Sequence, residues 1–183
     1  MIVYSTAKSP EDLQQIMALQ AQNLPQAVPA QEAATQGFVT VQHDLDLLAA
    51  MNEKYPHQLA LAEGRVVGFA LVMLPEFGDK IPVLVPMFRL LDQLEYRGTP
   101  LREQAYFVMG QVCIDKAYRG QGIFRELYEK LRRDMAPHFS LLVTEIATRN
   151  TRSLQAHAAL GFRHLHRYTA DGEEWDIVTW DLR

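Results

Sequence analysis

The stretch Tyr118-Arg119-Gly120-Gln121-Gly122-Ile123 joins an apolar, strand-like run that ends at Ile114 to an amphipathic pattern that begins at Ile123. A helix start leaves its first N–H groups without intrahelical acceptors and carries a partial positive charge, so it favours an anion. Glycines in the preceding turn let the backbone come close to such an anion. The stretch therefore predicts a phosphate or pyrophosphate site. The simpler alternative is a strand-to-helix connection in which the glycines only ease the turn.

Two familiar phosphate-binding motifs do not fit this stretch. No Lys-Ser or Lys-Thr pair follows Gly122, so it is not a Walker A loop. Phe124 stands where the three-glycine dinucleotide fingerprint has further small residues, so that fingerprint is absent too.

Apolar periodicity on both sides of the turn predicts alternating helices and strands. Helices are expected from Ser9 or Pro10 to Pro25, from Asp44 to Pro56, from Ile123 to Pro137 and from Asn150 to Gly161. Strands are expected at residues 58–62, 66–74, 104–114, 141–147, 162–168 and 174–182. Residues 24–36 resemble a loop, and residues 75–100 an elaboration with a short helical segment near 87–94. This alternation is typical of an α/β or α+β sheet protein.

Composition sets the broad class. The 183 residues predict a single domain, 1–183, with 48% hydrophobic and 22% charged residues. The net charge of −4 and the lack of a basic stripe argue against a nucleic-acid partner. No apolar run is long enough for a membrane span, and no signal peptide is recognisable. A single cysteine, Cys113, fits a reducing compartment, so the cytoplasm is expected.

Two motifs in order resemble the GCN5-related N-acetyltransferase superfamily. The first is Arg119-Gly120-Gln121-Gly122-Ile123-Phe124, which is similar to the family's Gln/Arg-x-x-Gly-x-Gly/Ala. The second is the set Asn150, Ser153, His157, Gly161 and Phe162, at the family's spacing. The resemblance is strongest over residues 104–168 and implies a mixed sheet of six or seven strands, flanked by about four helices and splayed in its middle. Phe124 departs from the pattern, which usually has Gly or Ala there.

The resemblance implies acetyl-CoA as the cofactor. The turn would hold its pyrophosphate, and the strand edge at 112–114 would pair with its pantetheine arm. The residues expected to bind it are Val112, Cys113, Ile114, Arg119, Gly120, Gln121, Gly122, Ile123, Phe124, Asn150 and Ser153. Asn150 is also a good helix N-cap, a role that is compatible with a cofactor contact.

Two residues are candidates for proton transfer. His157 stands where the family commonly has a Tyr that protonates the leaving thiolate, and imidazole can donate a proton near neutrality. The alternative is a partly buried histidine that donates to a carbonyl. Glu145 stands in an apolar strand, at the spacing where some family members place a general base. Strand alternation could instead point it to solvent.

Other candidates have plainer interpretations. Cys113 reads as a small core residue, and the cationic group Arg163, His164, His166 and Arg167 as a solvated strand face that could alternatively touch a phosphate. Met73, Met87 and Phe88 are assigned to the core rather than to a substrate pocket. No histidine has partners at metal-ligand spacing, so no metal is expected.

The predicted function is direct transfer of an acetyl group from acetyl-CoA to a primary amine of a small molecule or a protein. One alternative is a non-catalytic CoA-binding regulatory module; another is a transferase for a longer acyl group, with residues 75–100 shaping a roomier pocket. The closing strand at 174–182 could pair across a homodimer. The identity of the acceptor is not readable from the sequence.

Overall fold

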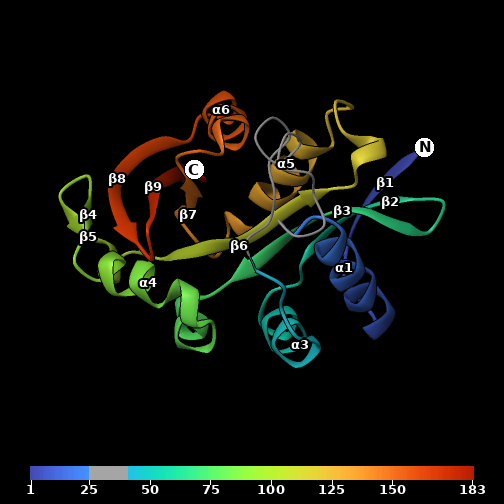
Figure 1. Ribbon diagram of the computed structural model, residues 1–183, viewed down its shortest axis with the longest axis horizontal. Helices are drawn as coiled ribbons and strands as arrows, with labels where there is room; N and C mark the ends of the chain where they lie inside the picture. Colours follow the sequence, from blue (N-terminus) through green and yellow to red (C-terminus); the bar gives the residue numbers. More distant parts are fainter. Residues whose placement is uncertain (25–40) are drawn as a thin grey trace.

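A seven-stranded mixed sheet organises the chain, and the computed structural model describes residues 1–24 and 41–183. Its strands are β1 (Ile2–Thr6), β2 (Gln58–Ala62), β3 (Arg65–Met73), β6 (Tyr106–Ile114), β7 (Leu141–Ala147), β8 (Arg163–Ala170) and β9 (Glu173–Asp181). They lie in the order β1-β2-β3-β6-β7-β9-β8, with β1 at the right and β8 at the left of Figure 1. All neighbouring strands are antiparallel except β6 and β7, which are parallel. The mixed α/β sheet matches the predicted fold class.

The helices are α1 (Pro10–Gln22), α3 (Leu45–Lys54), α4 (Val85–Leu91), α5 (Ile123–Met135) and α6 (Thr151–Leu160). Each predicted helix is confirmed within a few residues. Ser9 and Asp12 form a capping box at the start of α1, and Asp44 caps α3 by accepting from the Leu47 N–H. The six predicted strands are confirmed as well. The prediction missed β1, a short strand that pairs with β2.

Residues 75–100 form the expected elaboration. They contain 3₁₀ turns at Pro75–Lys80 and Pro82–Leu84, helix α4, and a small hairpin of β4 (Glu95–Tyr96) and β5 (Thr99–Pro100). Met87 and Phe88 are buried in the core, as assigned from the sequence. Of the predicted loop at 24–36, all but Leu24 lies outside the described residues.

Two hydrophobic clusters cover the two faces of the sheet. One includes Phe69 and Leu71 of β3 and packs under α1, α3 and α4. The other includes Leu127 and Leu131 of α5, whose apolar stripe faces the opposite side. Burying one such leucine contributes about 2 kcal/mol, so each helix is held mainly by its buried face.

The middle of the sheet opens between its two parallel strands. β6 and β7 pair only from Tyr106–Leu141 to Val108–Val143, although the strands continue to Ile114 and Ala147. The two strands therefore diverge toward their carboxyl ends, as Figure 1 shows. This is the splay that the resemblance implied.

A β-bulge in β6 changes which side chains face each side of the sheet. Leu71 of β3 pairs with Gln111, but the next residue, Val72, pairs with Met109, so Gly110 is an extra residue on β6. Before the bulge, Tyr106 and Val108 belong to the cluster under α1 and α3; after it, Cys113 does. Even-numbered side chains of β6 therefore face α1 before the bulge, and odd-numbered side chains face it afterwards. Gln111 thus lies on the side of α1, at the point where the sheet splays.

Candidate functional site

The glycine turn has the backbone that its sequence predicts. Gly120 and Gly122 have φ angles of +75° and +80°, in the left-handed region that residues with a Cβ seldom adopt. A Cβ added at either position would meet no atom within 4 Å. Backbone conformation, rather than lack of space, therefore requires glycine here.

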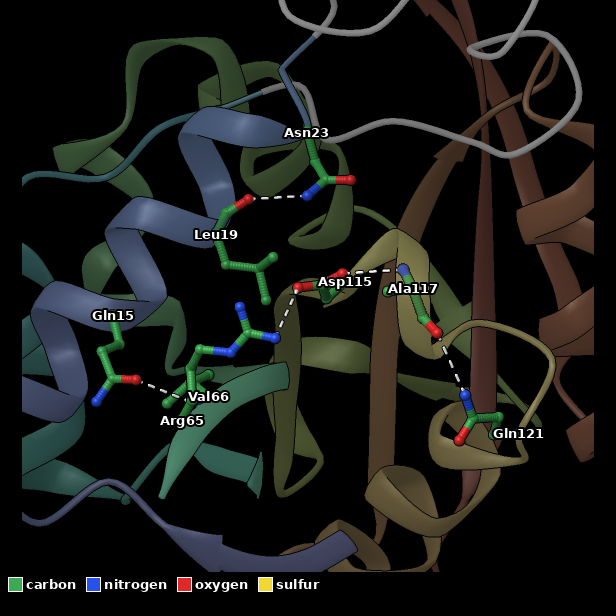
Figure 2. A network of polar contacts seen from close by, with 8 residues as sticks. All are labelled: Gln15, Leu19, Asn23, Arg65, Val66, Asp115, Ala117 and Gln121. Carbon is green, nitrogen blue, oxygen red and sulfur yellow. Dashed lines mark hydrogen bonds and ion pairs between the residues drawn. The ribbon is translucent and has the colours of Figure 1, made fainter. Parts of the chain in front are cut away.

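Side chains on both sides hold the turn in place (Figure 2). The Asp115 carboxylate accepts from the Ala117 N–H at 2.9 Å, and it lies 3.8 Å from Arg65 of β3. The Gln121 amide donates to the Ala117 carbonyl at 3.3 Å. The side chain of Gln121 thus closes the turn, which leaves its backbone N–H as the group that could bind a cofactor.

Helix α5 begins directly at this turn and presents its first N–H groups to a cavity of about 340 Å³. Its N-cap, Gly122, supplies no side chain to satisfy those groups, so a thirteen-residue helix offers an uncapped positive end. Ten of the eleven predicted cofactor residues line this cavity, and Gln121 is the exception. Asn23, Tyr118, Arg152 and Ala156 line it too and were not predicted.

Asn23 ties helix α1 to the turn. Its side chain donates to the Leu19 carbonyl, as Figure 2 shows, and its Oδ1 accepts from the Arg119 guanidinium at 2.7 Å. Arg119 also donates to the Ile114 carbonyl at the end of β6. No local sequence signal could reveal this contact, because 96 positions separate the two residues.

Asn150 and Phe124 combine structural contacts with a place at the cavity. Asn150 caps α6 by accepting from the Ser153 N–H at 3.2 Å. The Phe124 ring packs against Tyr128 and His157, with centroid distances of 4.9 and 5.1 Å. The larger side chain at 124 therefore packs against α5 and α6 while the backbone remains at the start of the helix.

A second cavity, of about 100 Å³, adjoins the first inside the splay. Val112, Asn150 and Ser153 line both cavities. Glu145 of β7 lines the smaller one, and burial raises the pKa of its carboxyl group to about 7. The Tyr168 hydroxyl of β8 donates a hydrogen bond to Glu145 and partly opposes that rise in pKa. The carboxyl group thus titrates close to neutrality beside a cavity, as a general base should.

His157 lines the same small cavity and has hydrogen bonds to both ring nitrogens. The Ser153 carbonyl, 2.7 Å from Nδ1, can only accept, so Nδ1 carries the proton. Tyr128 then donates its hydroxyl proton to Nε2 at 2.7 Å. Burial lowers the pKa of His157 to about 4, so the ring is neutral at pH 7. The hydrogen bond from Nδ1 to the Ser153 carbonyl is the contact that the alternative interpretation of the sequence expected. The role of His157 as an acid stays a prediction.

The remaining candidates have structural roles. Burial raises the pKa of Cys113 to about 12, so this residue is a thiol rather than a nucleophilic thiolate. In the cationic group of β8, Arg167 and His164 pair with Asp176 of β9, and neither lines the two cavities. Across the described ranges, no three His, Cys, Asp or Glu side chains gather as a metal site requires.

The sequence analysis missed one group of polar side chains at the small cavity, two of them buried and one half-buried. His43, Gln111 and the neighbouring Gln20 are hydrogen-bonded to one another, and the first two line the cavity. They come from the segment before α3, from β6 and from α1, so they belong to no shared motif.

Comparison with known proteins agrees with this architecture. The family model described as Acetyltransferase (GNAT) family matches residues 19–162. None of the curated protein sequences matches the chain. No helix within residues 1–24 and 41–183 combines the length and apolarity that a membrane crossing requires.

Solved structures share the fold at low sequence identity. The ribosomal-protein-S18-alanine N-acetyltransferase from Escherichia coli has 16% identity and a TM-score of 0.65, over 100% of this chain and 94% of that one. An N-acetyltransferase from Staphylococcus aureus Mu50 has 20% identity and a TM-score of 0.64, over 100% and 99%. Arabidopsis thaliana NAA60, solved in complex with acetyl-CoA, has 12% identity and a TM-score of 0.67, over 99% of each chain.

Proposed function

The chain belongs to the GNAT acetyltransferase family, and on that premise we propose that it is a single-domain enzyme that transfers the acetyl group of acetyl-CoA directly to a primary amine. One observation carries the proposal. The uncapped start of α5 and a carboxyl group with a near-neutral pKa face two adjoining cavities in the splay of one sheet. The start of α5 suits an anion, and the carboxyl group suits proton removal from an amine.

The larger cavity fits the cofactor by its chemistry. The first N–H groups of α5, with the left-handed glycines 120 and 122, form a cradle for a diphosphate. The edge of β6 at Val112 to Ile114 lies beyond the last pairing with β7, so its backbone is available to the amide groups of a pantetheine arm. Acetyl-CoA bound there would supply an activated thioester carbonyl and a thiolate leaving group.

The residues of the chain then assist the transfer. Glu145 removes a proton from the amine as the new C–N bond forms, and a backbone N–H near Cys113 donates to the carbonyl oxygen as the C–S bond breaks. His157 is the proposed acid toward the thiolate. It donates the Nδ1 proton as the imidazolium and so returns to the neutral ring; because burial lowers its pKa to about 4, that cation is a minor but strongly acidic form. Ser153 Oγ lies 3.3 Å from its Nδ1 and lines both cavities, so the proton can pass through that hydroxyl. Cys113, a buried thiol, needs no covalent role.

Two measurements test the proposed function. Calorimetric titration with CoA should show binding, and acetyl-CoA mixed with a panel of primary amines should release thiol only when an amine is present. Comparing acetyl-CoA with succinyl- and long-chain thioesters tests the acetyl preference. No binding at millimolar CoA would overturn the proposed cofactor, and tight binding without thiol release from any amine would overturn the transfer. Because Cys113 is the only cysteine and is buried, we expect the enzyme to work in a reducing compartment such as the cytoplasm.

A further inference from the structure

A chain of three polar side chains, of which Gln20 and His43 are buried and Gln111 is half-buried, reaches the small cavity from the side of α1. Gln20 of α1 donates from Nε2 to Nδ1 of His43 at 2.8 Å and lies 2.7 Å from Oε1 of Gln111. Gln111 occupies this face because of the bulge at Gly110. The three side chains thus link the first helix to the splayed strand.

Two backbone contacts fix the protonation of His43. The Gln111 amide nitrogen donates to the Val41 carbonyl at 2.7 Å, so Gln111 Oε1 is an acceptor and the Gln20 nitrogen must donate to it. The His43 N–H donates to Gln20 Oε1, which fixes the orientation of the Gln20 amide independently. Nδ1 of His43 therefore accepts from Gln20, and the proton of the neutral ring sits on Nε2. Burial lowers the pKa of His43 to about 4, which keeps the ring neutral.

Nε2 of His43 is a buried donor that no described group satisfies. The residue is only 3% exposed, and within residues 1–24 and 41–183 this nitrogen has no hydrogen-bond partner. Leaving a buried donor unsatisfied is unfavourable, so such groups are rare and need an explanation, of which a bound ligand is one. His43 lines the small cavity together with Glu145, the proposed base.

The charges around the cavity narrow the choice of ligand. Among the described residues that line it, Glu145 is the only one with an acidic or strongly basic side chain. Among these described residues, a carboxylate on the acceptor would meet no Lys or Arg, and a polyamine would meet no second carboxylate. A cavity of about 100 Å³ holds only a few heavy atoms, so the group that meets His43 lies close to the accepting nitrogen.

We propose that His43 is a specificity-determining residue whose Nε2–H donates to an uncharged carbonyl oxygen next to the accepting amine, as in an α-amino amide. The inference rests on the proposed function, acetyl transfer to a primary amine, and it names the class of amine that accepts the acetyl group. Gln20 and Gln111 are positioning residues, because they hold the donor tautomer of His43. The α-amino group of a peptide has this chemistry, as does a free amino-acid amide.

The test uses two acceptors of similar shape. Alaninamide carries the carbonyl, and sec-butylamine replaces it with an ethyl group. The two amines differ in basicity, but this difference affects wild type and variant equally. It therefore cancels when the ratio of the two kcat/KM values in the variant is divided by the same ratio in wild type. His43→Phe should lower that ratio, alaninamide over sec-butylamine, about tenfold, which is the effect of roughly one lost hydrogen bond. His43→Gln, which can place an amide N–H near the position of Nε2, should restore part of the ratio.

His57 provides the matched control. It is equally buried, but its Nδ1 accepts from the Val72 N–H and its Nε2 contacts the Leu48 carbonyl, and it lines neither cavity. His57→Phe should cost stability yet leave the acceptor ratio unchanged. Equal losses for both acceptors in His43→Phe would overturn the inference. Lack of transfer to any amine in the wild type would instead overturn the proposed function.

Nuclear magnetic resonance of ¹⁵N-histidine wild-type protein keeps the inference testable if the variants fail to fold. At pH 7, His43 should show a protonated Nε2 and an unprotonated Nδ1. Added alaninamide should shift the Nε2 resonance of the CoA-saturated protein, and sec-butylamine should not. A proton on Nδ1, or equal shifts with both amines, would overturn the assignment.

Discussion

The Tyr168 hydroxyl donates a hydrogen bond to Glu145 even though strand β9 lies between their strands in the sheet. Glu145 pairs with Ile177 of β9 and Tyr168 pairs with Trp175, so the two residues are offset by two positions along β9. The hydrogen bond offsets part of the rise that burial causes in the pKa of Glu145, so the proposed base titrates near pH 7. Activity near neutrality therefore depends on a residue that lines neither cavity.

Replacing Tyr168 by Phe should move the pH profile. Loss of the donor raises the pKa of Glu145 further, because the carboxylate loses a hydrogen bond that favours its charged form. The rise of kcat/KM with pH should shift upward by roughly one pH unit. Tyr96→Phe is the matched control, since Tyr96 also donates to a carboxylate, that of Asp181, outside both cavities. An unshifted profile in Tyr168→Phe would contradict the base assignment.

Replacing Glu145 by Gln should abolish the rise of kcat/KM around pH 7 and lower it about a hundredfold. It should also change how stability depends on pH. The folded pKa of about 7 exceeds the ordinary 4.5, so the folded state retains the proton longer, and wild-type stability falls as pH rises between these values. The variant should lose this fall, which is on the order of 3 kcal/mol.

Denaturant titrations at pH 4 and pH 8 would check the second expectation. Glu53→Gln serves as the control, because Glu53 is exposed on α3 and lines neither cavity. A Glu145→Gln variant with the pH dependence of wild type would show that the carboxyl group is not held in its neutral form.

Gly122→Ala should weaken CoA binding about tenfold and cost roughly 1–2 kcal/mol of stability, because Ala is strained at a positive φ. Gly64→Ala gives a close match. Gly64 has a φ of +78° and open space around its Cα, but it lies in the β2–β3 hairpin. The two variants should lose similar stability, and only Gly122→Ala should show weaker binding by calorimetry. Equal CoA affinities would argue against the cradle.

His157→Phe tests the proton path to the thiolate. We expect kcat to fall roughly tenfold with little change in the KM for acetyl-CoA, together with lower stability from the lost Tyr128 contact. Tyr128→Phe removes that same contact but leaves Nδ1 and Ser153 in place, so it should reduce stability while keeping the rate. An unchanged rate and pH profile in His157→Phe would remove the histidine from the mechanism.

What the sequence could predict depended on short-range signals. Caps, helix periodicity and the left-handed glycines act within a few residues, so the helices, six strands of the sheet and the turn at 118–123 were all assigned correctly. The contacts of Asn23 with Arg119 and of Gln20 with Gln111 join residues more than 90 positions apart, so no local pattern contains them. β1 was missed because five half-exposed residues before a helix lack a clear alternation.

The chemistry of the site likewise has a part that short-range signals predict and a part that depends on distant elements. Ten of the predicted cofactor residues line one cavity: seven from the two motifs and three from the strand edge at 112–114. Each of these segments is a continuous turn, helix or strand. The surroundings of Glu145 and His157 come from other elements: Tyr168 from β8 and Tyr128 from α5. Their pKa values, about 7 and about 4, arise from burial in the assembled fold.

The bulge at Gly110 makes the acceptor side of the enzyme depend on the backbone conformation of β6 as well as on side-chain chemistry. If β6 kept Gly110 but ran through it in regular alternation, without the bulge, Val112 would face α1 and Gln111 would face α5. An aliphatic surface would then replace the amide that orients His43, although no polar residue had been mutated. Loss of this bulge is thus a route by which such an enzyme could change its acceptor while its coenzyme turn stays the same.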